Sequence, residues 1–321
     1  MRSSNGPLTD SELFLSVQHF CLQDGPGVRS LVFFKGCPLR CGWCQNPESW
    51  SSRPQLAFKD HLCIGCGRCV EACPGSQRRA PGLPPADCRL CFACNEACPS
   101  GALHRFGEPA CPAAIFRALE PEFPLFRRSG GGVTFSGGEP LLCPAAATEL
   151  ATRLRAEAIP VALETCGLFS LPRALSLLAL TELVLFDIKL FDDRSHRHWC
   201  GGSNQVIKEN LAALAANESV SVWPRLPLIP GATAQSANLD AWAIRLQELG
   251  LPYLTIVPYH ALGDGKRAWL GMKAGPPIPA LSDEMLQSSR DRLAGAGLRV
   301  FLPGEEEWEL CYEGRRVTGR S

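Results

Sequence analysis

Short runs of Val, Ile, Leu and Phe alternate along the chain with stretches whose apolar residues are spaced three or four positions apart. The runs predict β-strands, and the wider spacing predicts amphipathic helices. The predicted strands span residues 13–20, 31–34, 133–135, 161–164, 183–187, 220–226, 254–257 and 298–302. The predicted helices span residues 145–157, 171–178, 205–216, 239–249 and 284–294.

Strand and helix follow each other in strict alternation over the last two thirds of the chain. This order favours an α/β fold with a parallel sheet and crossover helices, either an open sheet or a full or partial βα barrel. Chemistry is then expected at the carboxyl ends of the strands. Residues 51–106 interrupt the pattern, because they are rich in Cys, Pro, Gly and Arg and show little periodicity. We predict that residues 54–106 are an insertion in one large domain, made of residues 1–53 and 107–321.

The charge balance gives no reason to expect a polyanionic partner. Lys plus Arg and Asp plus Glu both number 32, so no net field attracts nucleic acid or an anionic membrane. No apolar run reaches the roughly 18 residues that span a bilayer, and no signal-peptide core follows the polar start. We therefore expect a cytoplasmic protein without nucleic-acid or membrane partners, and we expect it to be a monomer.

Cysteine is frequent, with 17 residues. Because cytosolic thiols are kept reduced, metal ligation or catalysis explains them better than disulfides do. Most of them fall into three compact motifs. Those outside the motifs, which we interpret as small apolar residues, are Cys21, Cys111, Cys143, Cys166, Cys200 and Cys311.

The first motif is a CxxxCxxC loop formed by Cys37, Cys41 and Cys44, directly after the second predicted strand. Three thiolates on one loop can hold three irons of a [4Fe-4S] cube and leave the fourth iron open to another ligand. An open iron is a place for chemistry. The alternatives are free buried thiols or a zinc knuckle, which would lack its fourth ligand because the loop contains no histidine.

Two further motifs lie in the predicted insertion, and each matches the CxxCxxCxxxCP run of bacterial ferredoxins. In two-cluster ferredoxins the fourth cysteine of each run ligates the other cluster. The expected sets are Cys63, Cys66, Cys69 and Cys98 for one cube, and Cys88, Cys91, Cys94 and Cys73 for the other. A cube with four cysteines has no open iron, so these two clusters are expected to transfer electrons. The alternative is a pair of zinc sites.

Polar residues and glycines close several predicted strands. Gly137, Gly138 and Glu139 follow the third strand, where a missing Cβ lets the backbone approach a ligand, although a tight strand-to-helix turn explains the glycines as well. Charges at strand ends are costly unless they are paired or ligating. The charged or ionisable residues at the predicted strand ends are Glu164, Asp187, Lys189, Arg225 and His260. For Arg225 a structural ion pair remains an alternative, and for His260 the alternative is a structural histidine with satisfied hydrogen bonds.

The extended string around the first motif resembles the signature of glycyl-radical-enzyme activating enzymes in the radical S-adenosylmethionine (SAM) superfamily. The matching residues are Gly27, Arg29, Phe33, Gly36, the CxxxCxxC cysteines and Asn46. The ferredoxin-type runs resemble those of a subgroup with a two-cluster insertion. The resemblance implies a partial (β/α) barrel of the radical SAM type with a small ferredoxin-like insertion. It also implies three [4Fe-4S] clusters, of which the one with the open iron cleaves SAM reductively. The resulting radical would remove a hydrogen from a glycine of a partner enzyme.

The same resemblance implies roles for individual residues. Trp43 would lie against the adenine of SAM, and Gly137, Gly138 and Glu139 would hold its amino group. The SAM methionyl and nucleoside groups would be bound by Glu164, Asp187, Lys189, Arg225 and His260, with a possible monovalent cation near Asp187. The string Asp24, Gly25, Pro26 and Gly27 would lie near the incoming loop of a partner glycyl radical enzyme. The reductant would be a flavodoxin or ferredoxin-type protein.

Two other functions fit part of the sequence. A radical SAM enzyme acting on a small molecule would carry the same clusters and SAM site but would need no protein partner. A ferredoxin-type electron carrier would explain the insertion, but it would leave the CxxxCxxC loop and the charged strand ends without a purpose. A measurement of SAM binding separates these two alternatives, because the radical SAM enzyme would bind SAM and the electron carrier would not.

Overall fold

The main sheet is built from the predicted strands. The computed structural model describes residues 12–75, 78 and 80–312. Nine strands pair in the order β11-β10-β9-β8-β7-β6-β2-β1-β5. They are β1 (Leu13–Cys21), β2 (Arg29–Lys35), β5 (Glu108–Pro109), β6 (Gly132–Gly137), β7 (Val161–Thr165), β8 (Leu183–Asp187), β9 (Ser221–Leu228), β10 (Tyr253–Pro258) and β11 (Arg299–Phe301).

The sheet forms a partial βα barrel. Neighbours from β2 through β6 to β11 are parallel, whereas β1 is antiparallel to β2 and to β5. In the described part of the chain β11 and β5 stand at opposite ends of the strand order and do not pair, so the barrel is open. No helix within the described ranges is long and apolar enough to cross a membrane.

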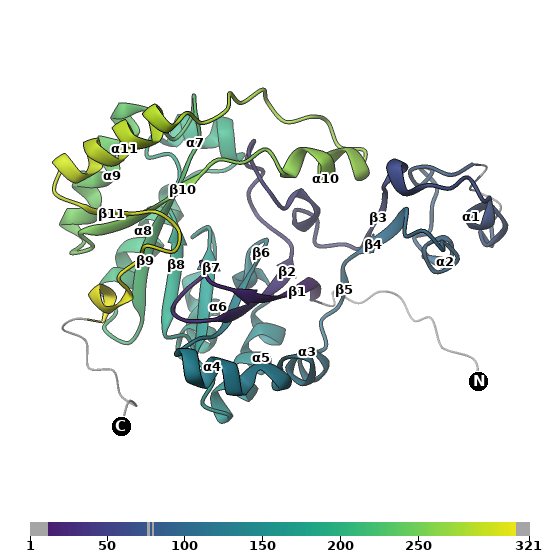
Figure 1. Ribbon diagram of the computed structural model, residues 1–321, viewed down its shortest axis with the longest axis horizontal. Coiled ribbons are helices and arrows are strands. Elements are labelled where there is room, and N and C mark those ends of the chain that lie inside the picture. Colours follow the sequence, from purple (N-terminus) through teal and green to yellow (C-terminus); the bar gives the residue numbers. More distant parts are fainter. Residues whose placement is uncertain (1–11, 76–77, 79, 313–321) are drawn as a thin grey trace.

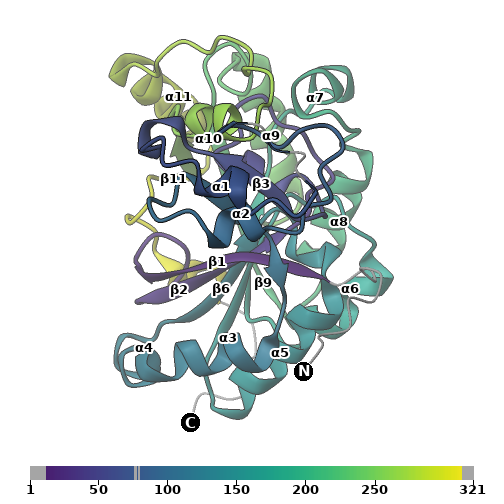
Figure 2. The same cartoon turned by 90° about the vertical axis from the view of Figure 1, so that its right-hand side faces the viewer.

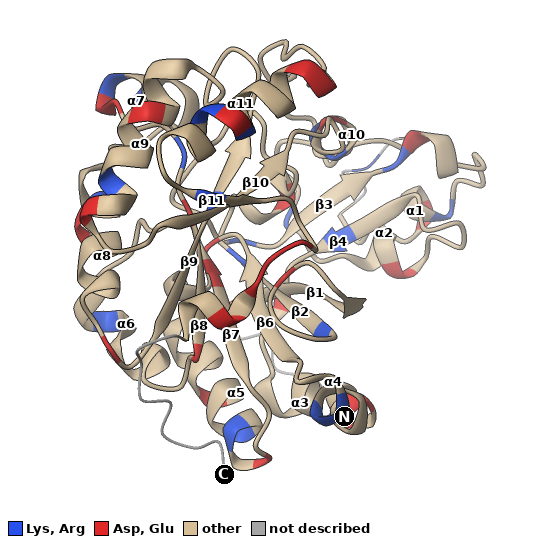
Figure 3. Cartoon of the chain, turned by 60° about the vertical axis from the view of Figure 1, so that its left-hand side comes forward, with Lys and Arg blue, Asp and Glu red and all other residues tan. Residues whose placement is uncertain are grey.

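Helices cover the outside of this sheet, and Figure 3 shows α5, α6, α8 and α9 as an outer arc around the strands. In α5 the buried residues recur at the spacing of one helix face, and Leu150 and Leu154 are fully buried. Burial of each such leucine stabilises the fold by about 1.5–3 kcal/mol. The helices are α3 (Pro112–Leu119), α4 (Phe123–Ser129), α5 (Pro144–Ala156), α6 (Leu171–Leu178), α7 (Asp193–Cys200), α8 (Gln205–Ala215), α9 (Ser236–Glu248), α10 (Gly263–Trp269) and α11 (Asp283–Gly295).

The strands and helices predicted from apolar spacing are confirmed, with ends within three residues of those observed. Four shorter helices, α3, α4, α7 and α10, were not predicted. Helix α7 has few apolar residues, so spacing could not reveal it. Its start is marked instead by Asp192, whose carboxylate accepts a hydrogen bond from the Ser195 N–H at 2.8 Å.

The segment predicted as an insertion lies outside the barrel, and Figure 1 shows it projecting from one side. It contains a two-stranded antiparallel sheet, β3 (Gln55–Phe58) and β4 (Leu103–Phe106), and two one-turn helices, α1 (Arg68–Glu71) and α2 (Ala93–Glu96). Sequence periodicity did not predict these strands and helices. The segment has its own small apolar cluster, formed by Leu56, Cys69, Phe92, Cys94 and Leu103.

The two cysteine runs of the insertion have the same local backbone structure. Gly67 follows the second cysteine of the first run and precedes α1 with φ of 74°. Phe92 holds the same place before α2 with φ of 62°, which is uncommon for a residue with a side chain. The Arg105 guanidinium lies 4.4 Å from the centre of the Phe92 ring and covers it. The two runs therefore fold alike although their residues differ.

Candidate active site

A cavity of about 380 Å³ opens at the carboxyl ends of the parallel strands. This volume falls in the range of pockets that bind small molecules and cofactors. Most of the residues predicted for the cysteine loop, the SAM site and the partner turn line it, although they come from six separate segments of the chain. Those that line it are Asp24, Cys37, Cys41, Trp43, Cys44, Gly137, Gly138, Glu164, Asp187, Lys189 and Arg225.

The CxxxCxxC loop follows β2 and is fixed by its neighbours. The N–H of Arg40 donates to the Cys200 carbonyl at 2.7 Å, and the N–H of Gly42 donates to the Trp199 carbonyl at 2.9 Å. Trp43 is buried, with its ring centre 6.2 Å from that of Trp199. All three loop cysteines face the same cavity, with space beside them. This arrangement fits a cube held by three thiolates that leaves one iron open to a ligand in the cavity.

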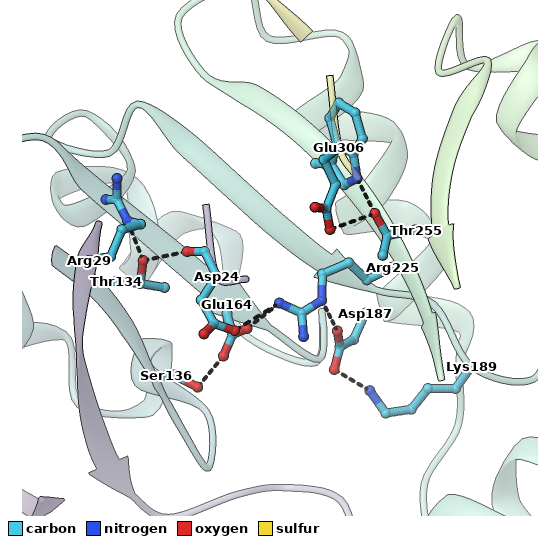
Figure 4. Close-up of polar contacts among 11 residues, drawn as sticks. Asp24, Arg29, Thr134, Ser136, Glu164, Asp187, Lys189, Arg225, Thr255 and Glu306 are labelled. Atoms are coloured by element: carbon cyan, nitrogen blue, oxygen red, sulfur yellow. Dashed lines mark hydrogen bonds and ion pairs between the residues drawn. The ribbon is translucent and has the colours of Figure 1, made fainter. Parts of the chain in front are cut away.

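The centre of the charged group is Arg225, which lies on β9 and is drawn in Figure 4. Its Nη1 pairs with Glu164 and lies 3.6 Å from Asp24, and its Nε lies 3.8 Å from Asp187. Burial disfavours the charged form of Arg225, but the three carboxylates outweigh burial and raise its pKa. The guanidinium therefore supplies positive charge among three carboxylates from three different segments.

Glu164 has the most strongly perturbed carboxyl group in the cavity. Burial raises its pKa to about 7, and Asp24 and Asp187 add to the increase, while Arg225 and a hydrogen bond from Ser136 oppose it. Ser136 lies on β6 and was not among the predicted site residues. Its hydroxyl donates to Glu164 and leaves less of that carboxylate available to a ligand.

Lys189 provides a second cation in the cavity, just beyond β8. Its ammonium lies 3.3 Å from the carboxylate of Asp187, and the side chain is almost fully buried. Burial alone would lower the pKa of Lys189, but Asp187 and neighbouring thiols outweigh it, so the pKa is raised. Lys189 therefore stays protonated and can bind an anionic group of a ligand.

The glycines after β6 serve close backbone packing. A Cβ on Gly138 would lie 2.1 Å from the carbonyl oxygen of Gly36, and one on Gly137 would lie 2.3 Å from that of Phe34. The Glu139 N–H donates to the Gly36 carbonyl at 2.8 Å. These residues thus hold the strand end against the start of the cysteine loop. The sequence predicted that these glycines let the backbone approach a ligand. In the structure they let the chain pack closely against the backbone of Phe34 and Gly36.

Two predicted residues, Glu139 and His260, do not line the cavity. Glu139 is fully buried, and its carboxylate accepts hydrogen bonds from the Leu141 N–H, the Thr165 hydroxyl and the Cys166 N–H at 2.8–3.2 Å. The side chain is therefore occupied within the protein. His260 is exposed, and the residue before it, Tyr259, lines the cavity.

The turn after β1 is held by Arg29, which is buried on β2. Its guanidinium donates to Thr134 Oγ1 at 2.7 Å and to the Pro26 carbonyl at 3.2 Å. Thr134 donates in turn to the Asp24 carbonyl at 2.7 Å. This network places Asp24 at the cavity, whereas Gly25, Pro26 and Gly27 do not line it. Gly27 is required by packing, since a Cβ there would lie 2.4 Å from the Ser129 carbonyl oxygen.

One cysteine interpreted as an apolar residue lies in the site. Cys166 follows β7 and lines the cavity together with Thr165. Of the other five, Cys111 is exposed and the rest are buried. The signal that marks Cys166 is its place directly after a strand that ends in polar residues.

The insertion brings one predicted cysteine set together. Cys63, Cys66, Cys69 and Cys98 line a single small cavity of about 20 Å³. Among the described residues no three His, Cys, Asp or Glu side chains converge closely enough to hold one metal ion. The second set, Cys88, Cys91, Cys94 and Cys73, stays a prediction from sequence spacing.

Comparisons with known proteins agree with this geometry. A family model described as a 4Fe-4S single cluster domain matches residues 23–70. The chain is 40% identical over 269 residues to the isethionate sulfite-lyase activating enzyme of Nitratidesulfovibrio vulgaris, covering 81% of this chain and 87% of that protein. It is 38% identical over 293 residues to the choline trimethylamine-lyase activating enzyme of Oleidesulfovibrio alaskensis, covering 86% and 92%.

Among solved structures, a domain of pyruvate-formate lyase-activating enzyme from Bacteroides vulgatus is 28% identical and covers 54% of this chain and 99% of its own, with a TM-score of 0.46. The sequence relatives, together with the cavity that holds the three-cysteine loop, define an iron-sulfur enzyme of the radical SAM class. Within that class, the chain belongs to the glycyl-radical-enzyme activating enzymes.

Proposed function

We propose that the cavity binds SAM beside a [4Fe-4S] cluster held by Cys37, Cys41 and Cys44. One electron supplied to the cluster cleaves SAM into methionine and a 5′-deoxyadenosyl radical. This radical takes one hydrogen atom from a glycine Cα of a partner glycyl radical enzyme, which leaves 5′-deoxyadenosine and a glycyl radical. The observation that carries the proposal is that the three thiols share one cavity with the buried charge of Lys189 and the partly buried charges of Asp187 and Arg225.

The charges form one continuous group in the cavity, because Asp187 lies near both Lys189 and Arg225. Lys189 and Asp187 form an ion pair near the cysteine loop and suit the carboxylate and amino groups of the SAM methionyl end. Trp43 provides an aromatic face for the adenine. Arg225 and Glu164 lie close to Asp24, which begins the Asp24–Gly27 turn, so this side faces the partner's glycine segment. A monovalent cation near Asp187 remains a prediction from the family resemblance.

The insertion is proposed to carry two more clusters that pass electrons to the first. The shared cavity of Cys63, Cys66, Cys69 and Cys98 supports one of them, and the repeated backbone conformation at Gly67 and Phe92 supports the other. The protein would act as a cytoplasmic monomer and accept electrons from a flavodoxin or ferredoxin-type donor.

Iron analysis and paramagnetic resonance test the proposal together. After anaerobic reconstitution we expect about twelve irons per chain, since three cubes of four are implied. Incubation with SAM, reductant and the partner enzyme should give a doublet signal from the remaining α-hydrogen of one glycine. The doublet should collapse when the partner contains α-deuterated glycine, and deuterium should appear in 5′-deoxyadenosine. Unlabelled 5′-deoxyadenosine formed while a small metabolite is consumed would favour the small-molecule enzyme instead.

A further inference from the structure

Helix α10 lies between the cysteine loop and the insertion, as Figure 1 shows. Its first residue, Gly263, packs against the loop backbone, because a Cβ there would lie 2.1 Å from the Cys44 carbonyl oxygen. One turn later the guanidinium of Arg267 donates to the Cys41 carbonyl at 3.1 Å and to the Gly42 carbonyl at 3.0 Å. The helix therefore contacts two of the three cysteines through their backbone.

Buried side chains reinforce this contact. Arg267 is 5% exposed and its guanidinium lies 4.6 Å from the ring centre of Trp50. The ammonium of Lys266 donates to Asn46 at 2.8 Å and pairs with the buried carboxylate of Glu48 at 2.6 Å. These charged contacts bind the helix to the loop.

The end of the helix contacts the insertion. The Trp269 ring centre lies 6.1 Å from the ring centre of His61 and 5.1 Å from the ammonium of Lys59. A Cβ on Gly271, just after the helix, would lie 2.6 Å from the Leu83 side chain. Lys59 and His61 immediately precede the first cysteine run of the insertion. Figure 2, turned so that the insertion faces the viewer, shows α10 behind the insertion.

The insertion has a second attachment at its base. There the ammonium of Lys35 donates to the Glu48 carbonyl and to the Gln55 side chain at 2.7 Å. A two-stranded stalk of β3 and β4 is a weak support by itself, because an isolated pair of strands is marginally stable. The Trp269 contacts with Lys59 and His61, just after β3, support this stalk from the side.

We propose that helix α10 braces the insertion against the cysteine loop, and that Trp269 is a positioning residue for electron transfer between them. This inference rests on the proposed function, because it needs clusters in both places. In the step concerned, one electron leaves a reduced cluster of the insertion and enters the cluster of the cysteine loop. No bond is formed or broken, and the electrons come originally from a low-potential one-electron donor.

The test compares Trp269→Ala with wild type and with Ala268→Ser, a change at the neighbouring exposed residue of the same helix. Each protein is reconstituted, reduced with dithionite, freed of reductant and mixed with SAM and the partner glycyl radical enzyme, whose glycine supplies the hydrogen atom that 5′-deoxyadenosine takes up. The first 5′-deoxyadenosine uses the electron already at the cysteine loop, and later product uses electrons from the insertion. In Trp269→Ala the first phase should match wild type, and the later phase should slow on the order of tenfold, since small displacements strongly affect positioned reactions.

Hydrogen exchange gives a readout that does not depend on turnover. The segment from Gln55 to Leu62 should exchange faster in Trp269→Ala, and Trp269→Phe, which keeps a ring, should restore both the exchange and the later phase. If Trp269→Ala does not fold, Trp269→Leu takes its place. An unchanged later phase in a variant with wild-type iron content would overturn the brace alone. Wild-type protein that saturates near four irons would overturn the three-cluster proposal, and the brace with it.

Discussion

Arg225 on β9 pairs with Glu164 on β7 across the intervening strand β8, inside the cavity. The pair links two strand ends that are 61 residues apart in the chain. Burial disfavours the charged form of both members, but the three carboxylates raise the pKa of Arg225, whereas the pKa of Glu164 is raised to about 7. Glu164 is therefore the group whose charge changes at moderate pH.

Stability should report this titration in a comparison of wild type with Glu164→Gln. The folded pKa of about 7 exceeds the ordinary value of 4.5. Between these values the folded protein binds one more proton than the unfolded chain, so this group's contribution to stability falls as pH rises through that window. The free energy of unfolding of wild type minus that of the variant should decrease from pH 5 to pH 7 and level off above pH 8. A difference that grows with pH would contradict the assignment.

Lys189 and His260 should differ in their effect on SAM affinity. Lys189→Met should weaken binding by roughly 10- to 100-fold, the loss of one hydrogen bond to a charged group, with unchanged iron content. The sequence resemblance places His260 at the same carboxylate, but the structure exposes it outside the cavity, so His260→Ala should change affinity less than Lys189→Met. Calorimetry on the reconstituted proteins measures both. Equal losses of SAM affinity in the two variants would show that His260 also contacts SAM.

Glu139→Gln should act through stability. Its carboxylate accepts three hydrogen bonds, two of them from Thr165 and Cys166. An amide would turn an NH₂ group toward these donors, and each buried group left unsatisfied costs about 1–3 kcal/mol. The expected result is a lower thermal midpoint. A variant with wild-type stability that fails to bind SAM would support the direct contact expected from the family.

Gly138→Ala should disrupt the cysteine loop. The added methyl group would collide with the backbone of Gly36, which cannot move away as a flexible side chain can. We expect the variant to lose about four irons while the insertion keeps about eight, because only one cube depends on this loop. Gly295→Ala in α11 is the control, since nothing lies within 4 Å of its Cβ position and its φ is not in the left-handed region. An iron content of about twelve in Gly138→Ala would show that the loop backbone can shift enough to accommodate the methyl group.

Local sequence patterns predicted those parts of the molecule that depend on local forces. Fully apolar runs such as Leu183–Phe186 become strands buried on both faces, and the three-cysteine spacing is chemically specific by itself. The orientation of strand-end side chains was harder to predict. Glu139 and Glu164 both follow or end strands, yet one turns to internal donors and the other to the cavity, because their partners come from distant segments.

Helix α10 illustrates the same limit. Its sequence includes two glycines in seven residues, which is unfavourable in a helix. It forms because Gly263 is needed for close packing and because Lys266 and Arg267 have partners more than 200 residues away. Sequence spacing carries no information about such contacts.

The two strands that lead into and out of the insertion have a consequence for how such a protein could arise. Gln55 pairs with Phe106, so the chain leaves the barrel and returns to it at neighbouring points. A linker of a few residues would close the barrel if everything between them were removed. The insertion is in this sense a cassette: removing it at these two points would alter no strand of the main sheet.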